Sequence, residues 1–307
     1  MNQLMSFPRH SMNETANAFD PLHRPIIILG APRSGTTFLG DILGVHRDLA
    51  YLVEPRLVWR YGNDAKSDML RREDAREEVC RHIRGSFANF VRRAGRRRLL
   101  EKTPSNSLRP AFVDAVFPDC LFIHIMRSPI DSVLSIRRLW LDHASGIRTI
   151  AKGRVSQRAG EISPMRLPYY WRELVHRFLP RPVARLFGQN IWGPRLPAIN
   201  CLLQEVDLLD VCALQWRSCI ESTKHFGERL PEDRYLEIRL EDLSDQHLGR
   251  LFEFCGIDSD STVWERFHRD HDPSLAHARR ARAQPQEIDR ILEWIEPTMR
   301  WIGYDLP

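Results

Sequence analysis

A short apolar run that leads into a glycine-containing loop constrains this chain most strongly. Residues 25–30 read PIIILG, a β-branched run closed by glycine, which is typical of a strand buried on both faces of a parallel sheet. The apolar residues beyond the loop recur at helical spacing: Phe38, Leu39, Ile42 and Leu43. The sequence therefore predicts a strand, a tight loop over 30–37 and a helix, the unit from which α/β folds are built.

Similar patterns recur along the chain. Three further strands are predicted at 98–104, 119–127 and 234–243, and helices at about 110–116 and from Ser128, with Pro129 at the first helical position. Alternating buried strands and helices favour an α/β fold with a three-layer core, in which helices flank a mostly parallel central sheet.

The domain organisation follows from changes in composition. Residues 1–22 resemble a flexible leader, and 23–307 are interpreted as one domain. Within it, 137–215 is predicted to be a helical insertion or lid. Residues 137–195 hold twelve basic side chains against three acidic ones, a net charge of +9 in a chain of net charge +5. That part of the chain is therefore strongly basic, which suits anionic partners.

Cysteine and apolar patterns bear on the cellular compartment. The six cysteines form no C-x-x-C pair, and several lie in apolar patterns, as expected for reduced core thiols. No apolar run approaches the length of a membrane span, and the N-terminus lacks the apolar core of a signal peptide. A cytoplasmic location is predicted.

The loop has the G-x-x-x-x-G spacing of a phosphate-binding loop, from Gly30 to Gly35. After a buried strand, such a loop presents converging N–H groups and the positive end of the next helix to a phosphate. ATP- and GTP-binding loops continue with lysine, but Thr36 stands at that position, and a cation, Arg33, comes three residues earlier. The departure argues against a nucleoside triphosphate held with magnesium.

This combination resembles the sulfotransferases that use 3′-phosphoadenosine 5′-phosphosulfate (PAPS) and release adenosine 3′,5′-bisphosphate (PAP). The family loop reads roughly P-[KR]-S-G-T-T-[FWL], and this chain matches it throughout with Pro32, Arg33, Ser34, Gly35, Thr36, Thr37 and Phe38. Arginine at the second position resembles the tyrosylprotein and many bacterial members rather than the cytosolic aryl enzymes. The family holds the 3′-phosphate with an arginine after a strand and a serine eight residues on, which implies Arg127 and Ser135.

The resemblance also implies catalytic residues. Cytosolic members use a histidine as the base, but Pro104 stands there in this chain. Glycan and tyrosyl members use a glutamate about twenty residues beyond the loop, which implies Glu54 as general base; Glu101 remains the alternative. Lys102 corresponds to a lysine that contacts the sulfuryl group, and Arg33 would stabilise charge at the bridging oxygen. No metal is implied.

The second part of the 3′-phosphate site and the acceptor site are predicted without a matching motif. Arg279 and Arg280 fall where relatives close a loop over the 3′-phosphate, without their glycine-rich spacing. The acceptor is expected to be a small molecule, glycan or lipid with a hydroxyl or amine group. The basic insertion would contribute to its site and could contact an anionic membrane or carrier, and no specific nucleic acid is expected. Two alternatives stay open: a non-enzymatic basic protein that binds nucleotides, nucleic acid or membranes, and a kinase with a degenerate phosphate loop.

Overall fold

A computed structural model describes residues 20–144, 191–272 and 283–306. Its centre is a five-stranded sheet in the order β2-β3-β1-β4-β5, and every neighbouring pair of strands is parallel. The strands are β1 (Ile26–Leu29), β2 (Leu49–Val53), β3 (Arg98–Lys102), β4 (Leu121–Met126) and β5 (Tyr235–Arg239). All four side chains of β1 and all six of β4 are buried, as expected for strands covered on both faces.

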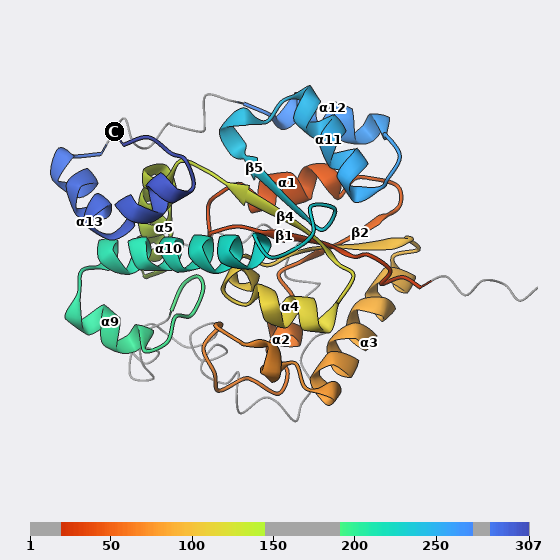
Figure 1. Cartoon of the computed structure of the whole chain (residues 1–307), viewed down its shortest axis with the longest axis horizontal. Helices are drawn as coiled ribbons and strands as arrows, with labels where there is room; N and C mark the ends of the chain where they lie inside the picture. Colours follow the sequence, from red (N-terminus) through yellow and green to blue (C-terminus); the bar gives the residue numbers. More distant parts are fainter. Residues whose placement is uncertain (1–19, 145–190, 273–282, 307) are drawn as a thin grey trace, which may run out of the picture.

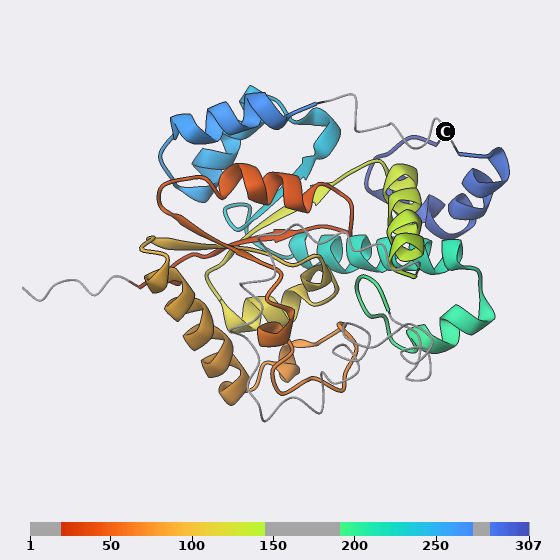
Figure 2. The ribbon, with the colours of Figure 1, turned by 180° about the vertical axis from the view of Figure 1, so that it is seen from behind.

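Helices cover both faces of the sheet, which confirms the predicted three-layer α/β fold (Figures 1 and 2). One face carries α1 (Thr36–Leu43), α11 (Asp245–Cys255) and α12 (Ser261–Asp270). The other carries α2 (Arg56–Trp59), α3 (Glu77–Arg93) and α4 (Pro110–Val116). Each face has its own apolar cluster because successive strand residues point to opposite sides: Ile26 and Ile28 pack with α1, and Ile27 and Leu29 pack on the α3 side.

A third apolar cluster extends the core beyond the sheet. It is built from α5 (Pro129–Ala144), α9 (Ile199–Glu205), α10 (Leu208–Gly227) and α13 (Pro285–Trp301). The remaining short elements are the 3₁₀ turns η1 (Arg72–Asp74), η2 (Pro104–Leu108) and η5 (Leu240–Asp242). Helix α10 begins at a capping box formed by Asp207 and Asp210, in which the Asp207 N–H donates to the Asp210 carboxylate. The Asp207 side chain also accepts from the Leu209 N–H, and the helix is buried along much of its length.

The structure refines several sequence predictions. Strand β2, which lies at the sheet edge, was not predicted, although all the predicted strands are present. Pro21 and Leu22, assigned to the leader, are buried, so a leader would end before them. Residues 137–144 and 208–215 of the predicted insertion belong to α5 and α10, two helices of the third apolar cluster. The lid itself stays a prediction, because residues 145–190 lie outside the described residues.

The cysteines are reduced, and most of them are buried. All six cysteines are free thiols; Cys120, Cys212, Cys219 and Cys255 are buried, whereas Cys201 is exposed. Burial raises the pKa of the four buried thiols well above its ordinary value. Among the described residues, no helix is both long enough and apolar enough to span a bilayer.

Candidate active site

The predicted phosphate loop connects the end of β1 to the start of α1. Gly30 has φ of 157°, and a Cβ there would lie 2.4 Å from the Ile125 carbonyl oxygen, so only glycine fits. The Ser34 N–H then donates to the Ala31 carbonyl at 3.2 Å, and Gly35, with φ of 94°, precedes the first residue of α1. Thus the loop closes in a tight turn and delivers Thr36 and Thr37 to the positive end of the helix.

Arg33 lies at the exposed tip of this turn and has φ of 72°, a left-handed backbone conformation that residues other than glycine rarely adopt. Its Nε donates to the Ser135 hydroxyl at 3.0 Å. Ser135 lies in α5, which follows β4, and Arg127 is half-buried between β4 and that helix. The structure therefore brings together the two motifs that the sequence assigns to opposite ends of one nucleotide.

Glu54 directly follows the edge strand β2 and also has a left-handed backbone, with φ of 51°. Its N–H donates to the Lys102 carbonyl at 2.9 Å, which continues the pairing of β2 with β3 for one more residue. The side chain is 14% exposed, and its two oxygens accept at 2.8 Å from the Lys102 Nζ and from Arg56. The carboxylate is thus held at the carboxyl end of the sheet by two cations.

Lys102, the last residue of β3, links this carboxylate to the loop. Its side chain is fully buried, and its Nζ lies 2.8 Å from Glu54 Oε1 and 3.1 Å from Thr37 Oγ1. Three neighbouring strands therefore contribute to one contact chain: β1 through Thr37 of the following loop and helix, β3 through Lys102, and β2 through Glu54. In parallel sheets, the carboxyl ends of the strands are where ligands bind.

Glu101 points to the opposite face of the sheet from Lys102, because neighbouring strand residues alternate. It is fully buried and accepts hydrogen bonds from Trp59 Nε1 at 3.0 Å, from Asn106 Nδ2 at 3.1 Å and from the Thr103 hydroxyl. Burial raises its pKa to about 7, although the hydrogen bonds from Thr103 and Trp59 and the charges of Lys102 and Arg109 oppose the rise. Glu54, rather than this alternative, is therefore the carboxylate that contacts Lys102.

The remaining predicted residues are distributed around the loop or lie outside the described residues. Pro32 and Ser34 are buried, and Phe38 is half-buried with its ring centroid 6.1 Å from that of His271. Arg279 and Arg280 lie outside the described residues. The resemblance implied separate roles for Thr37, Lys102 and Glu54, but no signal in the sequence indicated that the three side chains form one contact chain.

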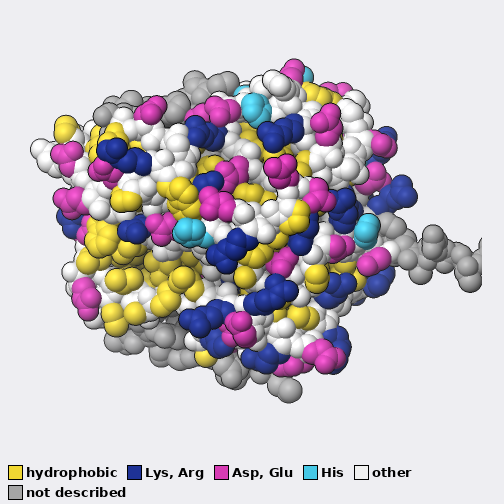
Figure 3. All heavy atoms as spheres, viewed as in Figure 1, with side chains coloured by type: hydrophobic (Ala, Val, Ile, Leu, Met, Phe, Trp, Pro, Cys, Tyr) yellow, Lys and Arg dark blue, Asp and Glu magenta, His cyan; other side chains and the backbone are white. Residues whose placement is uncertain are grey.

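The face of the molecule drawn in Figure 3 carries charges of both signs. In Figure 3, basic and acidic side chains are interspersed over much of the face drawn, and apolar side chains gather over α9, α10 and α13. Among the described residues, no group of three or more histidine, cysteine, aspartate or glutamate side chains is arranged to hold a metal ion.

Comparisons with known proteins agree with this fold. The model of the sulfotransferase family matches residues 25–179, half of the chain, and the chain belongs to this family. Nodulation protein NoeE of Sinorhizobium fredii is 28% identical over 137 residues, which cover 39% of this chain and 32% of that protein. The match therefore spans about a third of that relative's length.

Two solved structures share the fold. The sulfotransferase domain of the Synechococcus PCC 7002 olefin synthase has a TM-score of 0.52 at 20% identity and covers 94% of this chain and 98% of its own. The sulfotransferase domain from the curacin biosynthetic pathway has a TM-score of 0.53 at 17% identity, with coverages of 93% and 99%. At these identities the similarity establishes the architecture but not the substrate.

Proposed function

We propose that this protein transfers the sulfuryl group of PAPS to a hydroxyl, or an amine, of an acceptor by in-line displacement. One observation carries the proposal: the buried Lys102 ammonium bridges the first turn of α1, at Thr37, and the Glu54 carboxylate. A phosphate loop, a cation and a proton acceptor then lie in one contact chain, which is the set that sulfuryl transfer needs.

The nucleotide would be held by the loop and by the start of α5. The loop residues Pro32 to Phe38 would bind the 5′-phosphosulfate through N–H groups and the hydroxyls of Thr36 and Thr37. Arg127 and Ser135 would bind the 3′-phosphate, and Arg279 and Arg280 are proposed as further contacts. Arg33 already reaches Ser135 at 3.0 Å, so its guanidinium lies between the two proposed phosphate sites.

In the transfer step, the acceptor oxygen forms a bond to sulfur while the bond from sulfur to the bridging oxygen of the 5′-phosphate breaks. Glu54 takes the proton that the acceptor loses, and PAP leaves with the bridging oxygen. Lys102 and Arg33 stabilise the charge that spreads over the sulfuryl oxygens and the leaving oxygen, so a metal ion is not needed in this proposal.

The acceptor class is proposed more broadly: a small molecule, a glycan or a lipid. The two solved neighbours come from biosynthetic enzymes, which favours small-molecule acceptors, and the basic charge of residues 145–190 favours anionic ones. Six free thiols fit the proposed cytoplasmic location.

The proposal is tested by incubating the purified chain with labelled PAPS and a panel of acceptor extracts, with and without EDTA. Sulfated product that forms equally in EDTA supports it. A kinase would instead be stabilised thermally by magnesium ATP and not by PAP alone, and a basic binding module would retain DNA or acidic vesicles at low salt without forming product. Either of those results would replace the proposal.

A further inference from the structure

Gly30 follows β1 at a point where one of the two neighbouring strands, β3, has already ended. Strand β3 pairs with β1 only as far as Lys102, which lies opposite Ile28, and Pro104 beyond it has no N–H. The Gly30 N–H and C=O are nevertheless buried and need partners. Ser107 supplies both: its hydroxyl accepts from the Gly30 N–H at 2.8 Å and donates to the Gly30 carbonyl at 3.0 Å.

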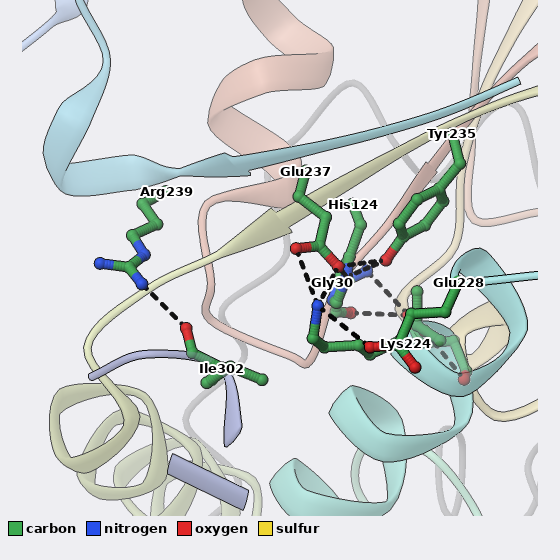
Figure 4. Close-up of polar contacts among 10 residues, drawn as sticks. Gly30, His124, Lys224, Glu228, Tyr235, Glu237, Arg239 and Ile302 are labelled. Atoms are coloured by element: carbon green, nitrogen blue, oxygen red, sulfur yellow. Dashed lines mark hydrogen bonds and ion pairs between the residues drawn. The ribbon is translucent and has the colours of Figure 1, made fainter. Parts of the chain in front are cut away.

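Ser107 is itself held in place from the other side. It is fully buried in η2, and its carbonyl accepts from the Thr223 hydroxyl of α10 at 3.2 Å. The next residue of α10, Lys224, binds Glu237 of β5 at 3.1 Å, and the Tyr235 hydroxyl joins Glu237 to His124 of β4. Figure 4 shows Gly30 close to this polar cluster. The residue that supports Gly30 is therefore bonded to α10, and the next residue of α10 is itself bonded to β5.

Gly30 has no side chain that could fix its own backbone, and the Ser34 hydroxyl of the loop bonds the next residue instead, at the Ala31 carbonyl. A Cβ at Gly30 would lie 2.4 Å from the Ile125 carbonyl oxygen and 2.8 Å from both the Ser34 hydroxyl and a Thr36 methyl group. A glycine has wide backbone freedom, so the direction in which the chain leaves β1 depends on external hydrogen bonds. That direction sets where the N–H groups of residues 34–37 point.

We propose that Ser107 is a positioning residue for the 30–37 loop and that Thr223 orients Ser107. The inference rests on the proposed function, because it assigns the loop to the phosphosulfate end of the nucleotide. The Ser107 hydroxyl fixes both backbone groups of Gly30 and so presets the loop for binding, without touching the ligand itself. Preorganisation of this kind raises affinity because less ordering is left to the binding step.

The test measures the dissociation constant for PAP by calorimetry, well below the unfolding temperature, for wild type, Ser107→Ala and Thr223→Val. We expect Ser107→Ala to weaken PAP binding about tenfold and Thr223→Val about threefold, the size of lost buried hydrogen bonds. The KM for PAPS should rise in proportion while kcat changes little. Thr298→Val in α13 is the matched control, because Thr298 is also a buried helical threonine that donates one hydrogen bond, to Glu221. Its PAP affinity should equal that of wild type.

The outcomes separate this inference from the proposed function. If wild type does not bind PAP, the proposed function fails and the inference fails with it. If wild type binds PAP and Ser107→Ala binds it equally well while folded, only the positioning role is overturned. An equal loss of affinity in Thr298→Val and Thr223→Val would also overturn it, because general destabilisation would explain both. If Ser107→Ala does not fold, the comparison of PAP affinity between Thr223→Val and Thr298→Val decides the question.

Discussion

Replacing Glu54 by glutamine removes the proposed proton acceptor while keeping the shape of the side chain. The glutamine oxygen can still accept from Lys102 Nζ, which now lies 2.8 Å from the carboxylate. General bases contribute about 10²- to 10⁴-fold to rates, so we expect kcat to fall by that factor and the KM for PAPS to change less than about threefold.

The stability cost of Glu54→Gln can be worked from the same contacts. In the variant the single amide oxygen can accept from only one of the two cations that Glu54 binds, the fully buried Lys102 or the exposed Arg56, and the amide NH2 cannot accept from the other. A cost of about 1–2 kcal/mol is expected. For a domain of this size it corresponds to a fall in Tm of roughly 2–8 °C, so the protein should stay folded in the assay.

The assay compares turnover of labelled PAPS in Glu54→Gln, Lys102→Met and the double variant. If the two residues act as one unit, the double variant should be no more than about tenfold slower than the slower single variant. Glu296→Gln serves as the control, because Glu296 forms an exposed ion pair with Arg300 in α13. Turnover by Glu54→Gln within tenfold of wild type would refute the assignment of the base.

Two further predictions concern binding and pH. Arg127→Ala should weaken PAP binding by about 10- to 100-fold, the loss expected for a charged hydrogen bond to phosphate, and unchanged affinity in calorimetry would remove Arg127 from the 3′-phosphate site. Burial raises the pKa of Glu101 from 4.5 in the unfolded chain to about 7, so the folded protein binds its proton more tightly. The free energy of unfolding should therefore fall by about 3 kcal/mol as pH rises from about 4.5 to 7, and level off above pH 7. In urea unfolding, Glu101→Gln should remove this dependence on pH. A pH dependence that is unchanged in the variant would contradict the prediction.

Much of the fold follows from local patterns in the sequence. Strand β1 is a continuous apolar run, and β4 is one interrupted only by His124, so their burial could be predicted. Strands β3 and β5 carry charged residues but have apolar residues enough to be predicted as strands. Strand β2 was missed although LAYLV is apolar throughout and as long as β3 and β5, because it closely follows the predicted helix and its apolar residues do not distinguish a strand from a buried helical segment. Its position at the edge next to β3 depends on pairing between distant segments, which sequence periodicity cannot reveal.

The candidate site could be predicted as a set of residues but not as an arrangement. The loop motif identified Arg33 and Thr37, and the spacing of Arg127 and Ser135 pointed to a second anion site. The motifs gave no sign that Arg33 bonds Ser135 or that Lys102 bridges Thr37 and Glu54. The alternation of side chains along a strand explains why Glu101 faces away from Lys102, but this alternation was not used in the sequence-based prediction, which kept Glu101 as the alternative base.

Backbone strain gives a reason, independent of the motifs, to assign Arg33 and Glu54 to the same site. Only four residues other than glycine have positive φ in the described part of the chain, and these are two of them. Neither has the short polar side chain that eases this conformation, so each costs of order 1–3 kcal/mol that the surrounding structure must offset. Glycine at either position would relieve the strain but would remove the charged group. The chain keeps a large charged side chain at both places, each in a loop at the carboxyl end of the sheet, and this fits the catalytic roles proposed for the two residues.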